Sequence, residues 1–216
     1  MTPTGEATFK VIKAEKKKPV KEVNANSFWS MLYHSSPFAP GLDWEVRKWK
    51  IKNFRNVFRG LWKIGISSLF NLPTHYGTLI LKVIKADGSE INYGLVSTRV
   101  VTDAGVGYIV DAWQNIVELE IMNFHAIGTG VTAENQTDTA LVTELTTQYT
   151  GDVRATGTLA ENAANIFETV ATNTIDSGGP VIIREHGVMN QAATGGGVLM
   201  DRTLFSAITL ETNDAL

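Results

Sequence analysis

The sequence predicts a mainly β protein: an antiparallel β-sandwich of jelly-roll or Ig-like type that follows a basic, partly helical N-terminal extension. Two observations favour the β class. Asp87-Gly88 separates the runs TLILKVIKA and EINYGL, and this dipeptide between apolar, β-branched runs is a strong hairpin signal. Beyond Glu118, apolar or alternating runs are separated by clusters of Gly, Thr, Asn and Asp, a spacing that is typical of two-sheet sandwiches.

A third observation, the distribution of charge, predicts the extension. Residues 1–85 contain 15 Lys and Arg against 5 Asp and Glu, a balance of +10. Residues 86–216 contain 4 Arg, no Lys and 17 Asp and Glu, a balance of −13. Such asymmetry indicates a basic element that meets something acidic, which is nucleic acid, a membrane surface or another copy of the protein. We divide the chain into a basic and aromatic arm with its helix, residues 1–76, and a sandwich domain, residues 77–216.

Composition excludes several other classes of protein. The chain has 216 residues, 44% of them hydrophobic, which is enough for one domain with a buried core. It contains no cysteine, so disulfides, thiolate metal sites and cysteine nucleophiles are excluded. It also contains no run of about 18 apolar residues, and we therefore expect no membrane-spanning helix.

The extension is predicted to have three parts. Residues 1–24 are a lysine-rich arm with too little apolar surface to fold alone. Residues 25–42 form a short helical turn and then an extended stretch, because Pro37 and Pro40 stop a helix. A longer helix follows over 43–63, with Asp43 as its candidate N-cap.

Two stripes run along the predicted 43–63 helix. The apolar stripe is formed by Ile51, Phe54, Phe58, Leu61 and Trp62. The basic stripe lies beside it, at steps of four, three, four and four residues, and is formed by Lys48, Lys52, Arg55, Arg59 and Lys63. Such a helix can lie on a membrane or on nucleic acid, dock on an acidic neighbour, or pack on its own acidic domain. Our candidate partner-binding residues are Phe28, Trp29, Lys48, Lys52, Phe54, Arg55, Phe58, Arg59 and Trp62.

The second half of the chain is predicted to hold one helix and several strands. The helix covers 102–114, with Asp103 as a candidate N-cap, and Trp113 lies on an apolar face that it shares with Ile109. The expected strands lie in 118–128, 165–175, 180–189 and 201–212.

Three strings resemble parts of catalytic or phosphate-binding motifs, but we predict that all three are turns. Residues 176–180, DSGGP, match most of the serine-protease element around its nucleophile, yet Ile175 replaces the first Gly and no His has a matching context. Residues 128–130 lack the third Gly of a dinucleotide loop, and residues 195–197 lack the Lys-Ser/Thr of a phosphate loop. The four histidines are not spaced as ligands on one element, so we expect no catalytic site, metal or cofactor.

The order of four segments in the second half resembles tailed-bacteriophage virion structural proteins. The segments are STRVVTDAGVGYIVDAW, FHAIGTGVTAENQTDTALVTEL, ATNTIDSGGPVIIREHGVM and GGGVLMDRTLFSAITLETND. In that group a GTGxTAxxxxDTAL run is followed by an EHG strand and a DRxxFSAI strand. The resemblance implies a non-enzymatic β-sandwich particle protein in which the matching residues place turns and brace loops. These residues are His125, Gly128, Gly130, Asp138, Thr139, Leu141, Glu185, His186, Gly187, Asp201, Arg202, Phe205 and Ile208.

The expected function is therefore structural. We expect a capsid decoration or cement protein on the outside of the head, which contacts other virion proteins, first the major capsid protein, and forms homo-oligomers in the particle. A tail, neck or baseplate component is the alternative, because the resemblance does not choose a location. A nucleic-acid-binding protein is a rival class, for which we expect only weak binding, since no groove reader or stacking surface is evident.

Overall fold

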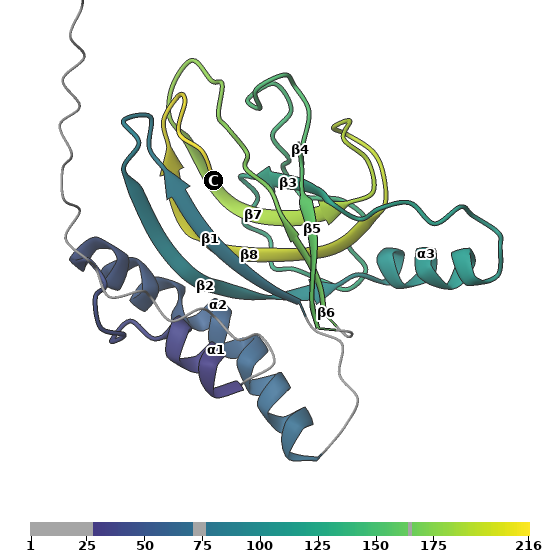
Figure 1. The fold of residues 1–216 in the computed structure, drawn as a ribbon, viewed down its shortest axis with the longest axis horizontal. Coiled ribbons are helices and arrows are strands. Elements are labelled where there is room, and N and C mark those ends of the chain that lie inside the picture. Colours follow the sequence, from purple (N-terminus) through teal and green to yellow (C-terminus); the bar gives the residue numbers. More distant parts are fainter. Residues whose placement is uncertain (1–27, 71–76, 164–165) are drawn as a thin grey trace, which may run out of the picture.

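The computed structural model describes residues 28–70, 77–163 and 166–216. The described strands form a six-stranded antiparallel sheet, in the order β1-β2-β8-β7-β3-β4, and a separate two-stranded ribbon, β5-β6. Figure 1 shows that the large sheet is strongly curved, with α1 and α2 below its convex side and α3 projecting from one end. The mainly β class is confirmed. The strands are β1 Gly77–Ile84, β2 Glu90–Val101, β3 Phe124–Gly128, β4 Ala155–Thr156, β5 Thr158–Ala163, β6 Ile166–Val170, β7 Val181–Met189 and β8 Leu199–Leu210.

The predicted hairpin around Asp87-Gly88 is confirmed as β1 and β2. Gly88 has a φ of 81°, which favours glycine, and its N–H donates to the carbonyl of Lys85 at 2.8 Å. Gly94, with a φ of 62°, lies in a bulge where the β1–β2 register shifts. Bulges of this kind bend a strand and add twist, which agrees with the curvature of the sheet.

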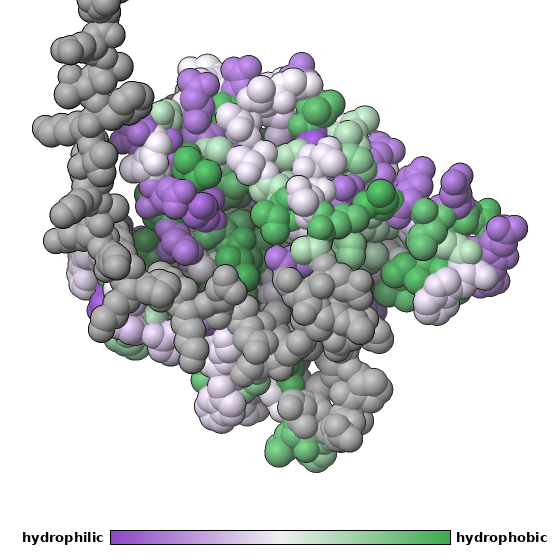
Figure 2. Space-filling model, in the orientation of Figure 1, coloured by the Kyte–Doolittle hydropathy of each residue, from purple (hydrophilic) through white to green (hydrophobic). Residues whose placement is uncertain are grey.

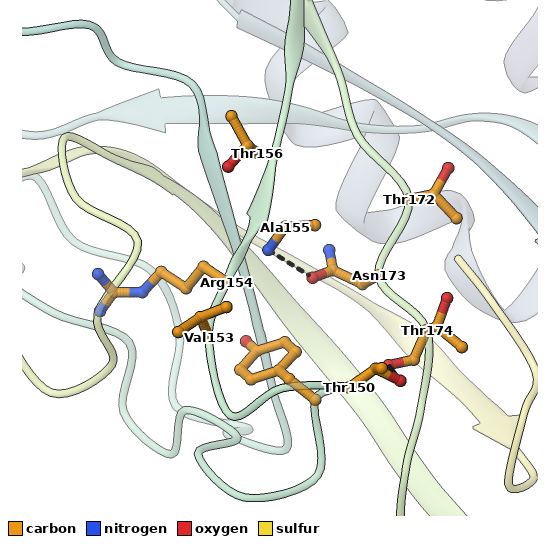
Figure 3. A pocket seen from close by; sticks show the side chains of 9 residues that line it. Thr150, Val153, Arg154, Ala155, Thr156, Thr172, Asn173 and Thr174 are labelled. Atoms are coloured by element: carbon orange, nitrogen blue, oxygen red, sulfur yellow. Dashed lines mark hydrogen bonds between the residues drawn. The ribbon is translucent and has the colours of Figure 1, made fainter.

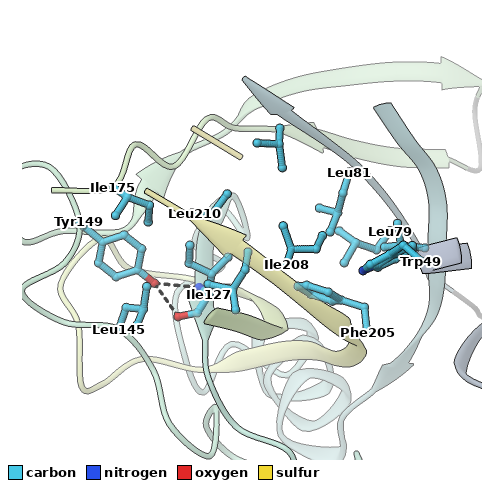
Figure 4. Close-up of a cluster of buried hydrophobic side chains, with 13 residues drawn as sticks. Trp49, Leu79, Leu81, Ile127, Leu145, Tyr149, Ile175, Phe205, Ile208 and Leu210 are labelled. Carbon is cyan, nitrogen blue, oxygen red and sulfur yellow. Dashed lines mark hydrogen bonds between the residues drawn. The ribbon is translucent and has the colours of Figure 1, made fainter. Parts of the chain in front are cut away.

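The main core lies against β1 and β8 and is closed by the segment between β3 and β4 (Figure 4). Tyr149, from that segment, is buried, and its hydroxyl bonds to both backbone groups of Ile127, accepting from N–H at 2.8 Å and donating to the carbonyl at 3.0 Å. Burial raises the pKa of Tyr149 above its ordinary value. The segment between β3 and β4 is therefore held to β3 by one aromatic side chain, whose hydroxyl both donates and accepts a hydrogen bond.

The N-terminal helices are α1, Phe28–Ser35, and α2, Trp44–Leu69. The first is the helical turn predicted in 25–42, and the second confirms the predicted 43–63 helix and extends it to Leu69. The arm of residues 1–24 lies outside the described residues. α2 turns one side to the protein, and its buried apolar residues there are Val46, Trp49, Val57, Leu61 and Ile64.

The side of α2 that faces the core is not the apolar stripe identified in the sequence. Leu61 is buried, whereas Ile51, Phe54, Phe58 and Trp62, which were assigned to the same stripe, are exposed. The helix has two apolar stripes, and periodicity alone does not say which one meets the sheet. Which side of α2 packs on the sheet is decided by polar contacts of residues that lie among the buried ones.

Asn53 and Trp49 attach α2 to two strands. β2 pairs with β8 through Val100–Arg202 and Val101–Asp201. Further along, Asn53 donates to the carbonyl of Val96 in β2 at 2.5 Å and accepts the N–H of Ser206 in β8 at 2.8 Å. The indole N–H of Trp49 is shared between the carbonyls of Ser206 and Ala207, at 3.1 and 3.0 Å. Side chains of α2 thus satisfy strand groups that a neighbouring strand would otherwise pair.

α3, Asp103–Trp113, confirms the predicted 102–114 helix but not its cap. Thr102, not Asp103, is the N-cap, since its hydroxyl accepts the N–H of Gly105 at 3.1 Å. A Cβ on Gly105 would lie 2.7 Å from the Cα of Met200, so only glycine allows the helix to approach β8 this closely. Glycine lowers the helix propensity of this segment, yet Gly105 is the residue through which α3 packs against β8.

The remaining strand predictions are confirmed with shifted ends. β6, β7 and β8 lie in the runs predicted at 165–175, 180–189 and 201–212, although β8 begins two residues earlier. Only the end of the 118–128 run is a strand, β3, and its first part is an exposed irregular segment. A two-sheet sandwich and a boundary at residue 76 stay predictions, while Trp49 joins α2 to the main core.

Truncation tests where the folding unit begins. We expect a chain that starts at residue 42 to stay soluble and to melt cooperatively, with a loss of about 2–5 kcal/mol because buried Met31 no longer covers Val57. A chain that starts at residue 77 lacks Trp49 and Asn53, and we expect it to lose cooperative unfolding in circular dichroism. If the shorter chain melts cooperatively, α2 is not part of the folding unit.

Candidate functional site

The outward side of α2 presents aromatic rings beside cations. Phe54, Phe58 and Trp62, at steps of four residues, form a continuous ladder with ring centroids 5.5 and 6.1 Å apart. Trp62 is 61% exposed, and the two phenylalanines are also exposed. We call this surface the basic-aromatic face, and its residues are Lys48, Lys52, Phe54, Arg55, Phe58, Arg59 and Trp62.

The cations of the basic-aromatic face are almost all available to a partner. Lys48 pairs with Glu45 at 2.6 Å and lies over the ring of Trp44. Within the described part of the chain, no ion pair involves Lys52, Arg55 or Arg59. Large exposed aromatic side chains beside uncompensated cations are typical of protein interfaces.

The two candidate residues from α1 differ in their surroundings. Trp29 is exposed, and its ring meets Phe28 edge-on at 5.5 Å. Phe28 is half-buried, because it packs on the cluster that joins α1 to α2. Trp49, which also lies in the predicted extension, packs in the main core and cannot serve as an anchor for a partner. The structure therefore brings seven candidates onto one helix face and places Trp29 and Phe28 on the neighbouring helix.

Sequence reasoning missed a second exposed apolar surface. α3 and the segment that follows it, which we call the α3 projection, residues 103–121, bury only Gly105. Trp113, which the sequence places on the apolar face of the helix, is 80% exposed. Figure 2 shows this projection at the right, where hydrophobic side chains lie beside hydrophilic ones. The available signal is that apolar residues surround the helix and continue past its end, as in Val106, Val110, Trp113, Ile116, Val117, Leu119 and Ile121.

Many of the motif residues meet in a buried polar centre. Glu185 and Arg202 are both fully buried, with a carboxylate oxygen 2.8 Å from the guanidinium. Arg202 also donates to Asp138 at 2.8 Å and to the carbonyl of Thr132 at 2.9 Å. Burial by itself would lower the pKa of Arg202, but the hydrogen bonds to Asp138 and Glu185 outweigh it and raise the pKa above its ordinary value. This arginine stays charged and holds the DTAL loop to β8.

Glu185 fixes the chain on both sides of that loop. Its carboxylate accepts the backbone N–H groups of Gly130, Thr143 and Val142, at 3.0, 2.8 and 3.2 Å. A Cβ on Gly128 or Gly130 would collide with the Glu185 side chain. The two glycines of the GTG string are therefore required by close approach, not by a bound nucleotide.

Among the described residues, His125, His186 and Ser177 form hydrogen bonds within the fold. His125 and His186 are buried, and their Nδ1 and Nε2 atoms lie 3.0 Å apart, while Thr169 bonds the other nitrogen of His125 at 3.0 Å. The hydroxyl of Ser177 donates to the carbonyl of Gly179 within its own turn, at 2.5 Å. A nucleophilic serine instead needs an acceptor that removes its proton.

The pocket in Figure 3 is a small polar hollow of about 230 Å³ beside Arg154 and Asn173. The guanidinium of Arg154 is bidentate to Glu144, at 2.5 and 2.8 Å, and also donates to the carbonyl of Gln191. The side-chain oxygen of Asn173 accepts the N–H of Ala155 at 3.3 Å. The guanidinium of Arg154 and the side-chain oxygen of Asn173 therefore already serve the fold.

Metal sites and membrane-spanning helices are two further classes of feature that the described residues lack. In the ranges given above, no three His, Asp or Glu side chains are grouped so that they could hold a metal ion. The same ranges contain no helix with the length and apolarity that a membrane crossing requires.

The buried ion pair can be tested by truncating one partner. Glu185→Ala leaves Arg202 charged and three N–H groups without an acceptor, and we expect a loss of about 3–5 kcal/mol in the free energy of unfolding in urea. Glu90→Ala, which removes an exposed partner of Lys82, is the control and should cost about 1 kcal/mol or less. A loss from Glu185→Ala as small as that of the control would contradict the bracing role.

Lys50 gives a prediction for pH. It is buried, donates to the carbonyl of His34 at 2.6 Å, and burial lowers its pKa to about 8 from 10.5. Between these values the unfolded chain holds a proton that the folded chain has released, so the contribution of Lys50 to stability rises with pH. Lys50→Met removes this dependence.

We therefore expect the stability of Lys50→Met, relative to that of the parent chain, to be highest near neutral pH and to fall progressively as the pH approaches 10.5. Urea midpoints of the two chains, measured across this range, check it. A difference that does not vary with pH would show that Lys50 is not desolvated in the folded state.

No family model, curated protein or solved structure matches this chain. The basic-aromatic face, the α3 projection and the buried polar centre are the observations from which a function can be inferred.

Proposed function

We propose that this protein is a structural component of a tailed-bacteriophage virion, and specifically a capsid decoration or cement protein on the outside of the head. The observation that carries the proposal is the basic-aromatic face, an uncovered ladder of three rings flanked by cations on a helix whose other side is anchored in the core. Surfaces of this kind supply aromatic anchors and charge-guided orientation for a protein partner. No catalytic function is part of the proposal.

The motif residues support the structural class. Gly128, Gly130, Glu185 and Arg202 brace one another in the buried centre. This is the role that the resemblance to virion proteins implies for them. The jelly-roll or Ig-like sandwich type belongs to the same proposal.

The proposed partner is the major capsid protein, with homo-oligomers forming in the particle. A decoration protein that binds the assembled shell and not its free subunits stabilises the shell by linkage. A tail, neck or baseplate position is the second candidate, because the same face could dock on any virion protein. In both cases the binding surface is the same, and only the location differs.

Nucleic acid is a weaker candidate partner. The cations of α2 could contact phosphates, but Phe54, Phe58 and Trp62 stack on one another, which leaves their faces less open to bases. Binding through the cations alone would be independent of sequence and would fall steeply with salt. Sub-micromolar binding to DNA at physiological salt would make this candidate the first.

Incorporation into particles tests the proposal. We expect Phe58→Ala with Trp62→Ala to remove the protein from purified virions, because exposed aromatic anchors contribute most of the affinity at such interfaces. Lys48→Glu with Lys52→Glu should weaken incorporation chiefly at low salt, since these charges are exposed and screened. The amounts are measured by quantitative mass spectrometry of particles.

The control is Phe167→Ala, which truncates an exposed aromatic side chain on β6, away from the basic-aromatic face. It should be incorporated like the parent chain. Normal incorporation of the aromatic double variant would reject the face as the anchor, and absence of the parent chain from all particles would reject the virion role. Labelling of heads or tails by antibody separates the two locations.

A further inference from the structure

The α3 projection is a surface without a partner in the described chain. Val106, Val110, Trp113, Leu119 and Ile121 are all exposed. Tyr108 fixes the shape of the projection, since its hydroxyl donates to the carbonyl of Glu118 at 2.6 Å and accepts an N–H from Glu120 at 2.7 Å. The projection is thus a braced hydrophobic element, and apolar surfaces of this kind mark sites of interaction.

The charge of the α3 projection restricts what can cover it. Its acidic residues are Asp103, Asp111, Glu118 and Glu120, and the sequence contains no Lys or Arg between Arg99 and Arg154. Two projections facing each other would bring like charges together, and an anionic membrane would also repel it. The partner must therefore combine apolar side chains with positive charge.

The basic-aromatic face has this combination, and it belongs to the same chain. It offers Phe54, Phe58 and Trp62 to the apolar residues of the projection and Lys52, Arg55 and Arg59 to its carboxylates. In one copy, α2 lies below the sheet and α3 projects from its end, well apart in Figure 1, and both surfaces are exposed. We propose that the α3 projection of one copy docks on the basic-aromatic face of a second copy.

A groove beside α3 adds a detail to this contact. It has a volume of about 440 Å³, and its lining includes Tyr108, Asp111, Val117 and Val198. An aromatic side chain such as Trp62 of the second copy can enter such an apolar groove, with the carboxylate of Asp111 available to a neighbouring cation.

The contact is heterologous, since two different surfaces meet. A chain of copies keeps a free basic-aromatic face at one end and a free α3 projection at the other, so repetition gives a closed ring or an open filament. This inference rests on the proposed assembly role of the basic-aromatic face and names a copy of the same chain as its partner. It requires no other virion protein and can be measured on the purified full chain.

Mixing two blocked variants is the decisive experiment. Phe58→Asp with Trp62→Asp blocks the basic-aromatic face, and Val110→Asp with Trp113→Asp blocks the projection; all four side chains are exposed, so folding should be retained and is checked by circular dichroism. In analytical ultracentrifugation we expect the parent chain to form oligomers and each variant to be monomeric. An equal mixture should form dimers and stop there, because only one complementary junction remains.

Single substitutions give the size of the effect. Trp113→Ala should lower the association constant about tenfold or more, as truncation of an aromatic anchor does, while Phe167→Ala should leave it unchanged. Raising the salt concentration should slow association more than it speeds dissociation.

The other outcomes overturn the proposal in distinguishable ways. Self-association of the variant with a blocked α2 face alone would indicate a contact between two projections, and self-association of the other variant alone would indicate a contact between two α2 faces. A monomeric parent chain would reject a contact between copies. If the mixture dimerises but particles lack the protein, the contact stands and the virion role fails; if particles contain a chain that never self-associates, only the contact fails.

Discussion

The buried pair of Glu185 and Arg202 is the interaction on which the rest of the sheet depends. Neither charge is exposed, so each must be compensated within the protein. The carboxylate is compensated by three backbone N–H groups from the segment after β3, and the guanidinium by Asp138 and a carbonyl in the same segment. One ion pair between β7 and β8 thereby fixes a loop of irregular structure, and that loop in turn supplies Tyr149 to the main core.

α2 has two roles that lie on opposite sides of one helix. On the inner side, Asn53 and Trp49 bond to backbone groups of β2 and β8, which sets the rotation of the helix about its axis. Once that rotation is set, Phe54, Phe58 and Trp62 must point outward, although they are as apolar as the residues inside. The exposure of the basic-aromatic face is therefore a consequence of two polar contacts made by other residues.

This geometry explains which parts could be predicted from sequence. The Asp87-Gly88 hairpin, α2 and α3 depend on local signals, and they were predicted within a few residues apart from the end of α2. The side of α2 that is buried depends on Asn53 bonding to strands more than forty residues away, and no local pattern contains that information. The GTG string was assigned to a turn, but Gly128 ends β3 and residues 129–130 are irregular, and the residue that requires its glycines, Glu185, is distant in sequence. The exposure of Trp113 was missed because an apolar helix face predicts burial but does not distinguish burial within the same chain from burial against a partner.

The buried ion pairs explain why the second half of the chain has an acidic surface. Arg202 and Arg154, two of the four arginines after residue 85, are buried and paired with Glu185 and Glu144, so they neutralise interior carboxylates and add little to the surface. Few cations are then left to balance the exposed acidic residues of the sheet and of the α3 projection. Exposed ion pairs contribute little free energy, so the electrostatic field of these acidic residues would act mainly on the orientation of a partner and on its association rate. The aromatic ladder would supply the affinity. Affinity and electrostatic guidance would then come from different side chains of the same helix.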